Sequence, residues 1–227
     1  MMQPKAKAYR FRASSAEELF ESRNCLFILA VNWLLQGVRG MDPKEIGFRL
    51  LLLALGTLLA GWALAGLFAL PYLTGSALGL LVAHTLNFLL NGQLWVVLRY
   101  CPGYRREPAR LARAIGVLLD DVARRPWLAE AVLLGSTVTR LTAPRSRADI
   151  DLRLIFPPGC AGWLRTNLYL LRLRFMASCT GLPLDVYAYA HPAVLRRFDQ
   201  DEPLGIILDR DCRLKRGFAN RELVWLR

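Results

Sequence analysis

The most informative part of this chain is AVLLGSTVTRLTAPRSRADIDLRLIF, residues 131–156. It opens with a short apolar run that stops at Gly135 and Ser136, the pattern of a buried strand followed by a turn. A second apolar run begins with Asp149 and Asp151. Because side chains two apart on a strand point to the same side, these two carboxylates should lie together while the isoleucine between them enters the core. We therefore predict two strands that present a glycine turn and a carboxylate pair.

The residue types in this stretch suit the binding of a metal ion and a phosphate group. Adjacent carboxylates repel unless a cation lies between them, and such oxygen ligands suit Mg²⁺, with Mn²⁺ as a substitute. Gly135 would let the backbone approach a ligand closely, and Ser136 can offer a hydroxyl and an amide to phosphates. In the connecting loop, Arg140, Arg145 and Arg147 could contact triphosphate oxygens, and solvated loop charges are the equal alternative.

The order Gly-Ser, spacer, Asp-apolar-Asp resembles the signature of the DNA polymerase β nucleotidyltransferase superfamily, especially its minimal nucleotidyltransferases. The resemblance covers roughly residues 107–210. It implies that Asp149 and Asp151 are the paired metal ligands and that the Gly-Ser turn holds the triphosphate. The third carboxylate of the family lies on a later strand, and Asp185 in the run LDVY is the matching residue.

By the same resemblance, two metal ions would flank the α-phosphate, and Asp185 would orient or deprotonate the acceptor hydroxyl. The chain departs from the family's common form, in which a basic residue and a glycine soon follow Gly-Ser, because no glycine lies between Ser136 and Asp149. The subfamily and the substrate are therefore left open. Asp-x-Asp is also frequent on the solvated face of an edge strand. Asp209 and Asp211 repeat the spacing without a Gly-Ser turn and are assigned no role.

The surrounding sequence predicts an α+β fold, a small mixed-sheet domain with flanking helices. Apolar residues at helical spacing predict a helix over residues 107–124. The later elements are expected as a helix at 163–177, a strand at 184–190, a short helix at 192–198 and a strand at 205–208.

Two long apolar runs precede this domain and predict an all-α transmembrane hairpin. Residues 48–70 hold a single charge, Arg49, at an end where it can snorkel to the membrane interface, and residues 76–98 form the second run. Each run reaches the roughly 20 residues that cross a bilayer. A hairpin buried in a soluble core is the weaker alternative, because a chain of 227 residues could not cover it. The expected units are an N-terminal segment at 1–46, the hairpin at 47–100 and a nucleotidyltransferase domain at 104–227.

The charges that flank the hairpin predict its orientation. Basic residues lie beyond both outer ends, and the connecting turn has none. The positive-inside rule therefore puts both termini and the downstream domain in the cytoplasm, at an inner or plasma membrane. Upstream, residues 14–38 predict a helix whose apolar part is too short to span, so an interfacial or packed helix is expected.

Polar and small residues in the hairpin indicate how its helices pack. His84, Asn87 and Asn91 share a helical face, where hydrogen bonds to a neighbouring helix are the more common reading and a polar site for a lipid head group or substrate is the alternative. Small residues would allow close packing within the hairpin or in a homo-oligomer; they are Gly56, Ala60, Gly61 and Ala65.

Composition narrows the partners only in part. The chain has 30 Lys and Arg against 18 Asp and Glu, a net charge of +12 that would attract phosphates, nucleotides, nucleic acid or anionic lipid. The five cysteines form no CxxC pair, which favours reduced thiols over a zinc site or a disulfide framework. Arg165, Arg172 and Arg174 are expected on a solvated helix face.

These features favour a membrane-anchored, Mg²⁺-dependent nucleotidyltransferase that moves a nucleoside monophosphate from a nucleoside triphosphate to a hydroxyl or phosphate acceptor. The anchor favours an acceptor held at the bilayer, such as a lipid-linked molecule or a membrane protein. Nucleic acid is not favoured as a partner, because little sequence remains for domains that grip a duplex. The alternative is a catalytically silent, membrane-tethered nucleotide-binding or regulatory scaffold.

Overall fold

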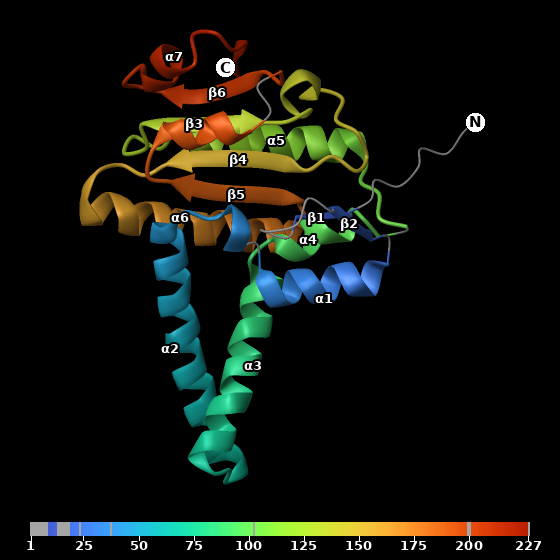
Figure 1. Cartoon of the computed structure of the whole chain (residues 1–227), viewed down its shortest axis with the longest axis vertical. Helices are drawn as coiled ribbons and strands as arrows, with labels where there is room; N and C mark the ends of the chain where they lie inside the picture. Colours follow the sequence, from blue (N-terminus) through green and yellow to red (C-terminus); the bar gives the residue numbers. More distant parts are fainter. Residues whose placement is uncertain are drawn as a thin grey trace.

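A five-stranded mixed sheet with helices forms the upper part of the molecule, and a helical hairpin projects from it (Figure 1). The computed structural model describes residues 9–12, 19–22, 24–36, 38–101, 103–198 and 201–226. The helices are α1 (Cys25–Leu35), α2 (Pro43–Phe68), α3 (Tyr72–Leu90), α4 (Gln93–Leu98), α5 (Pro108–Ala123), α6 (Gly159–Thr180) and α7 (Arg213–Gly217). The strands are β1 (Tyr9–Arg12), β2 (Leu19–Ser22), β3 (Glu130–Leu134), β4 (Ile150–Ile155), β5 (Leu184–Tyr189), β6 (Leu204–Asp209) and β7 (Leu223–Trp225). The 3-10 helices are η1 (Val38–Gly40), η2 (Val138–Arg140) and η3 (Pro192–Arg197).

The sheet has the strand order β5-β4-β3-β6-β7. Its central strand β3 runs antiparallel to β4 and β6, while β4 and β5 run parallel. The alternation predicted for the second half of the chain holds, because Ile150, Leu152 and Leu154 are all fully buried on one face. They join a core with α5 and α6, which includes Leu118 and Leu170. The predicted α+β class is confirmed, and the short helix expected at 192–198 is the 3-10 helix η3.

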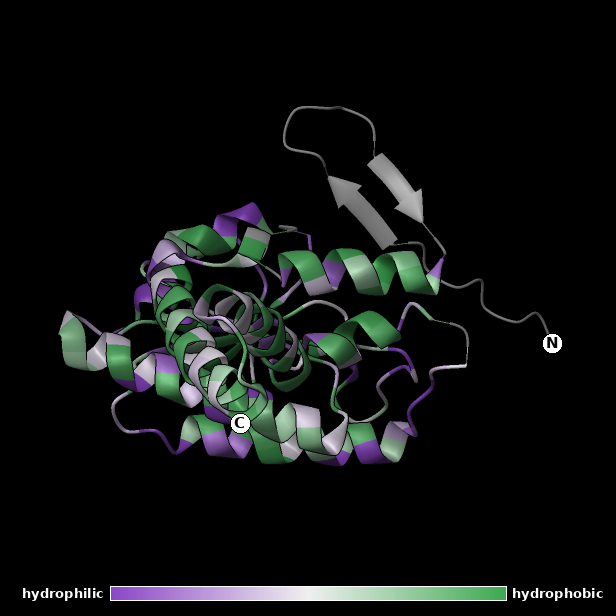
Figure 2. Ribbon diagram, turned by 90° about the horizontal axis from the view of Figure 1, so that it is seen from below, coloured by the Kyte–Doolittle hydropathy of each residue, from purple (hydrophilic) through white to green (hydrophobic). Residues whose placement is uncertain are grey.

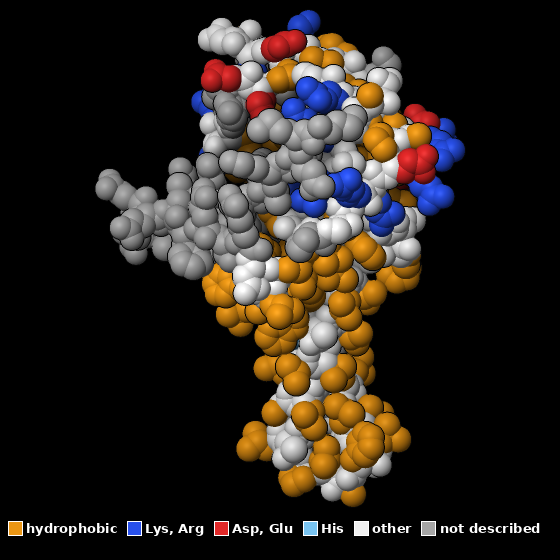
Figure 3. All heavy atoms as spheres, turned by 90° about the vertical axis from the view of Figure 1, so that its right-hand side faces the viewer, with side chains coloured by type: hydrophobic (Ala, Val, Ile, Leu, Met, Phe, Trp, Pro, Cys, Tyr) orange, Lys and Arg blue, Asp and Glu red, His pale blue; other side chains and the backbone are white. Residues whose placement is uncertain are grey.

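The hairpin of α2 and α3 exposes many large apolar side chains on its surface. Both helices are long and apolar enough to cross a membrane. Large side chains point outward, with Trp62 77% exposed and Leu73 82% exposed. Figure 3 shows hydrophobic side chains over the projecting hairpin and most charged side chains on the domain above it. Exposed apolar surface of this extent marks a membrane or protein contact.

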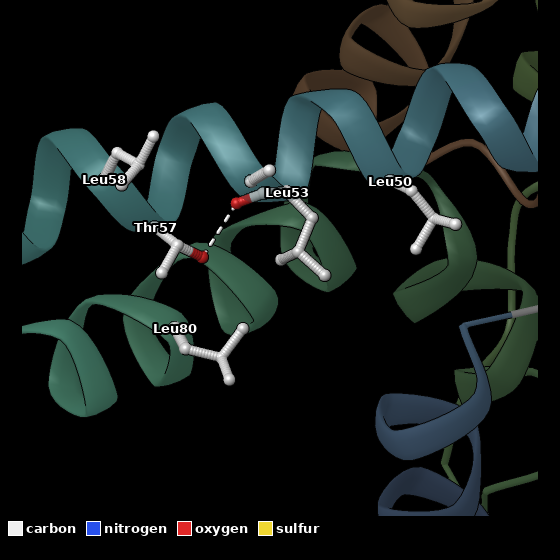
Figure 4. A pocket seen from close by; sticks show the side chains of 6 residues that line it. Leu50, Leu53, Thr57, Leu58 and Leu80 are labelled. Carbon is white, nitrogen blue, oxygen red and sulfur yellow. Dashed lines mark hydrogen bonds between the residues drawn. The ribbon is translucent and has the colours of Figure 1, made fainter.

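The two hairpin helices pack through their small residues. A Cβ atom on Gly79 would lie 2.5 Å from the backbone nitrogen of Gly61, and one on Gly75 would lie 2.9 Å from Ala65. The two helices line a shallow, open apolar groove of about 380 Å³. Figure 4 shows leucines of both helices along this groove, where the Thr57 hydroxyl donates to a backbone carbonyl of its own helix. The groove is lined without ionisable side chains, so it offers no acid–base chemistry.

The second apolar helix is shorter than predicted. It ends at Leu90, whereas the sequence predicted a span over residues 76–98. Gly92 has a φ of +74°, a left-handed conformation that glycine adopts readily and that turns the chain away from the helix axis. The following helix α4 is fixed to the domain, because the Trp95 indole donates to the carbonyl of Ser178 over 3.0 Å. Residues 93–98 therefore belong to the domain side of the hairpin.

Helix α1 lies beside the domain end of α3, below the domain (Figure 1), and is hydrophobic along most of its length (Figure 2). It begins at Cys25 behind the cap residue Asn24, and residues 19–22 form strand β2, so the helix predicted over residues 14–38 is wrong at 19–22; residues 13–18 lie outside the described residues. Its Gln36 donates to the carbonyl of His84 and accepts from Asn87. The polar face of α3 therefore bonds to a neighbouring helix, the more common of the two readings.

A disulfide joins Cys25 at the start of α1 to Cys101 after α4, with the two Cα atoms 5.1 Å apart. The expectation of reduced thiols throughout is wrong for this pair. The other three cysteines, Cys160, Cys179 and Cys212, are free and exposed. The disulfide ties α1 to the segment that leads from the hairpin into the domain.

Candidate active site

The three predicted carboxylates meet at the end of the sheet where β3 ends and β4 and β5 begin (Figure 1). Asp149 directly precedes β4, Asp151 is the second residue of that strand and Asp185 is the second residue of β5. The parallel register pairs Asp151 with Asp185, so the two side chains stand on neighbouring strands on the same face. All three carboxylates are only partly exposed.

The Gly-Ser turn lies directly beside these carboxylates. Gly135 follows β3 with a φ of +77°, and a Cβ atom there would lie 3.2 Å from Oδ2 of Asp151. The turn is closed by an N–H from Val138 to the carbonyl of Gly135 over 3.1 Å. It is tied to the acidic strand because the Thr137 hydroxyl donates to the backbone carbonyl of Asp149 over 2.8 Å. Backbone without a side chain therefore faces the acidic cluster.

The remaining predicted contacts of the turn lie toward solvent. Ser136 is exposed beside Gly135. Arg140 is exposed at the end of η2, and Arg147 is partly buried two residues before Asp149. In the part of the chain that the structure describes, neither arginine forms an ion pair. Both are therefore available to an anionic ligand. The same observation fits the alternative, in which these loop arginines contact only solvent.

Arg153 is a site residue that sequence reasoning missed. Its Nη2 lies 2.9 Å from Oδ2 of Asp185 and 3.4 Å from Oδ1 of Asp151, so the guanidinium bridges the two acidic strands. It is 5% exposed and lies over the ring of Tyr187, 5.0 Å from its centroid. The alternation of strand side chains puts residue 153 on the same face as Asp151. That signal was present in the sequence.

Arg99 is the second cation that the sequence did not reveal. It caps the C-terminal end of α4 and forms an ion pair with Asp149. Its guanidinium also donates to the Tyr100 hydroxyl over 2.6 Å. Fifty residues separate Arg99 from Asp149 in the chain, and no local pattern links them. The segment leaving the hairpin therefore reaches the candidate site directly.

Burial and neighbouring charges shift the pKa values of Asp151 and Asp185 in opposite directions. Burial, followed by the negative charge of Asp149, raises the pKa of Asp151 well above its usual value, although Arg153 opposes this. Burial would also raise the pKa of Asp185, but the charge and hydrogen bond of Arg153 outweigh it and lower that pKa. Asp185 is thus the carboxylate that the guanidinium stabilises most, while the positive charges of Arg153 and Arg99 offset the burial of Asp151 only in part.

The three carboxylates are suitable ligands for a divalent cation, provided that Arg99 moves away from Asp149. Three carboxylates offer the hard oxygen ligands that Mg²⁺ prefers. One oxygen of each already contacts an arginine, since Arg99 engages Asp149 and Arg153 engages the other two. Among the described residues, no three His, Cys, Asp or Glu side chains already converge so as to hold a metal ion. A metal ion would therefore need Arg99 to release Asp149.

The helical hairpin is bonded to the edge of the candidate site. Glu45 in the first turn of α2 is fully buried and accepts from the backbone N–H of Ala188 in β5 over 3.1 Å. It pairs with Arg174 over 2.6 Å and with Arg49 over 3.3 Å. The expectations that Arg49 snorkels and that Arg174 faces solvent are therefore wrong. In addition, Asp42 accepts from the N–H of Ala190 over 3.0 Å.

Two arginines on α6 fit the predicted solvated face better than Arg174 does. Arg172 is more than half exposed and pairs with Asp121 of α5 over 2.8 Å. Arg165 is exposed in the first half of the helix. The helix thus presents one arginine to the buried hairpin junction and the others to its outer side.

Comparison with known proteins returns no match, either to a protein-family model, to a curated protein or to a solved structure. The functional assignment therefore rests on the geometry and chemistry of the site itself.

Proposed function

We propose that this chain is a membrane-anchored nucleotidyltransferase that moves a nucleoside monophosphate from a nucleoside triphosphate to a hydroxyl or phosphate acceptor. The observation that carries the proposal is the position of the glycine turn after β3 directly beside the Asp151 carboxylate of β4, which is paired in register with Asp185 of β5. A turn without a Cβ lets phosphate oxygens approach the backbone. The adjacent acidic cluster is the place for the cation that a triphosphate brings.

Each site residue has a role that matches its position. Asp149, Asp151 and Asp185 would hold Mg²⁺, which when bound neutralises charge on the triphosphate. The amide and hydroxyl of Ser136 would bind phosphate oxygens at the turn. The arginines of the loop after the turn would orient the same group from the solvent side. Positioning and charge compensation of this kind supply most of the rate in phosphoryl-type transfers.

The acceptor is expected to be held at the bilayer. Arg99, which engages Asp149, follows α3 by only nine residues, so the site lies next to the exit of the hairpin. A lipid, a lipid-linked molecule or a membrane protein could be presented there, whereas a free acceptor gains nothing from the anchor.

Basic residues on both sides of the hairpin favour a cytoplasmic domain. Cytosolic thiols are kept reduced, so the disulfide between Cys25 and Cys101 counts against this placement. Labelling Cys212, which is exposed on the domain, with an impermeant maleimide in sealed vesicles of known orientation tests this placement. Labelling only from the extracytoplasmic side would contradict it.

The activity test uses the full chain in lipid nanodiscs with Mg²⁺, each α-labelled nucleoside triphosphate in turn and a membrane extract as the source of acceptor. The paired change Asp149→Asn and Asp151→Asn should abolish label transfer. Asp120→Asn, an exposed carboxylate on α5, is the matched control and should leave transfer unchanged. Equal transfer by the paired variant and the wild type would refute the assigned site.

A second candidate function follows from the arginine contacts. Because all three carboxylates already contact guanidinium groups, the site could bind a nucleotide without turning it over. A scaffold of this kind would bind a nucleoside triphosphate with little dependence on Mg²⁺ and transfer no label. Calorimetric titration of the wild type with and without Mg²⁺, beside the transfer assay, distinguishes the two functions.

A further inference from the structure

We propose that Arg153 is a resident cation of the site, fixed between Asp151 and Asp185, so that the site takes one exchangeable divalent ion instead of two. This inference rests on the proposed nucleotidyl transfer. The family resemblance implies two metal ions among three carboxylates, and the geometry of Arg153 removes the place for one of them.

The guanidinium lies where a bridging metal ion would have to be. Asp151 and Asp185 are a register pair on parallel strands, and one Nη atom of Arg153 contacts an oxygen of each, at 3.4 and 2.9 Å. A Mg²⁺ ion needs oxygen ligands at about 2.0–2.1 Å in a near-octahedral shell. It cannot bridge the same two oxygens while the guanidinium holds them.

Arg153 is anchored so that it cannot swing out of the site. Its Nη1 donates to the backbone carbonyls of Asp185, over 2.6 Å, and of Leu152, over 3.0 Å. The rings of Tyr187 and Phe198 lie 5.0 and 5.4 Å from its central carbon. Removing it would leave two backbone acceptors and two partly buried carboxylates without this donor, which proteins avoid.

Arg99 contrasts with Arg153 at each of these points. It is more exposed, with a side chain 16% accessible, and it ends a helix of six residues. Its hydrogen-bond and ion-pair partners are the side chains of Asp149 and Tyr100, and no backbone carbonyl among the described residues holds its guanidinium. It can therefore leave Asp149 without breaking backbone hydrogen bonds. The exchangeable ion is expected at Asp149 and the nearby oxygen of Asp151 that faces Gly135.

The stoichiometry of bound Mn²⁺ tests the proposal without relying on activity. The full chain in nanodiscs is saturated with a non-hydrolysable nucleoside triphosphate analogue and titrated with Mn²⁺, with free ion measured by electron paramagnetic resonance. We expect one Mn²⁺ per chain and no dipolar coupling between Mn²⁺ ions in pulsed spectra. Two Mn²⁺ per wild-type chain, coupled at short range, would overturn the resident cation while leaving the transfer reaction intact.

Two substitutions at Arg153 sharpen the test. Arg153→Met keeps much of the apolar volume and removes the charge, so the bound Mn²⁺ should rise from one to two per chain. Arg153→Lys keeps the charge and should bind one. A folded Arg153→Met variant that still binds one Mn²⁺ would contradict the proposal; if that variant does not fold, the wild-type stoichiometry decides.

Arg99→Gln separates the displaceable arginine from the resident one. Removing its competition for Asp149 should tighten Mn²⁺ binding about two- to fivefold, the size of an ordinary ion pair, and leave the stoichiometry at one. A second bound ion in this variant would place the resident cation at Arg99 and overturn its assignment to Arg153. Wild-type chain that binds no Mn²⁺ and no nucleotide analogue would refute the proposed function together with this inference.

Discussion

Replacing Glu45 by alanine removes the buried carboxylate that, together with Asp42, holds the helical hairpin to the edge of the sheet. Glu45 is fully buried and accepts from Arg174, from Arg49 and from the backbone N–H of Ala188. Both guanidinium groups are themselves buried, with side chains no more than 8% exposed. The variant would therefore leave two buried positive charges without their counter-ion and one strand N–H without its acceptor.

We expect this change to lower the free energy of unfolding by about 3–5 kcal/mol, the usual cost of removing one partner from a buried ion pair. For a chain of this size, 1 kcal/mol shifts the midpoint of thermal unfolding by roughly 2–4 °C, so the midpoint should fall by about 6–20 °C. The measurement is tryptophan fluorescence during heating in nanodiscs. Hydrogen exchange at the amide of Ala188 should accelerate as well, because its acceptor is gone.

Glu107→Ala is the matched control, since Glu107 forms a 3.0 Å ion pair with Arg110 on the surface of α5. Those side chains are 60% and 73% exposed, and such pairs contribute only about 0.2–1 kcal/mol. A double replacement, Glu45→Met with Arg174→Met, should recover part of the loss because both charges leave together. The reasoning fails if Glu45→Ala destabilises the protein no more than Glu107→Ala does.

Three further changes probe the turn, the surface and the hairpin. Gly135→Ala should cost about 1–2 kcal/mol from its positive φ and weaken binding of a triphosphate analogue in calorimetry, because the new Cβ would lie 3.2 Å from Asp151 Oδ2. Burial raises the pKa of Asp121, but hydrogen bonds from two arginines and a tyrosine lower it overall. Its stabilising effect is therefore present above about pH 4 and lost as the pH falls through the lower folded pKa, so the unfolding midpoint of Asp121→Asn should change less between pH 5 and pH 2 than that of the wild type. Gly79→Ala should destabilise the hairpin by about 1–3 kcal/mol in thermal unfolding, because its Cβ would meet the backbone of α2.

Each of these changes has a control within the chain. Gly103→Ala imposes a similar positive φ in open space, so a similar loss of analogue binding there would remove the assigned role of Gly135. Asp120→Asn alters an exposed carboxylate of the same helix as Asp121, and equal pH profiles for the two variants would contradict the hydrogen-bonded assignment. Gly66→Ala adds a methyl group to α2 where nothing lies within 4 Å, and its unfolding midpoint should not fall.

The strands and the carboxylates that they carry could be predicted because their signals are local. Alternation along residues 149–156 fixes which side chains share a face, and the Gly-Ser pair ends the preceding strand. Arg153 obeys the same alternation and could have been found beside Asp151. The end of α3 was missed because hydropathy alone does not register the turn at Asn91 and Gly92, although Asn-Gly is itself a local turn signal.

The ion pairs that complete the site depend on contacts far apart in the chain. Arg99 lies fifty residues before Asp149, and 129 residues separate Glu45 from Arg174. Sequence spacing reveals partners three or four residues apart on a helix or two apart on a strand, and it gives no register between such distant segments. The same limit applies to the disulfide, whose cysteines are 76 residues apart.

Hydrogen bonds from the sheet edge to the start of α2 make the hairpin structurally continuous with the domain. Strand β5 is an edge strand of the sheet, and exposed edges pair readily with other chains. Glu45 accepts from the N–H of Ala188 in β5, and Asp42 accepts from the N–H of Ala190 just past its end, so the residues that open α2 cover this edge. A fragment of residues 104–227 would lack both acceptors and should self-associate, as judged by light scattering, with rapid hydrogen exchange along β5. If that fragment were instead monomeric with β5 protected as in the full chain, the hairpin would be a tether only.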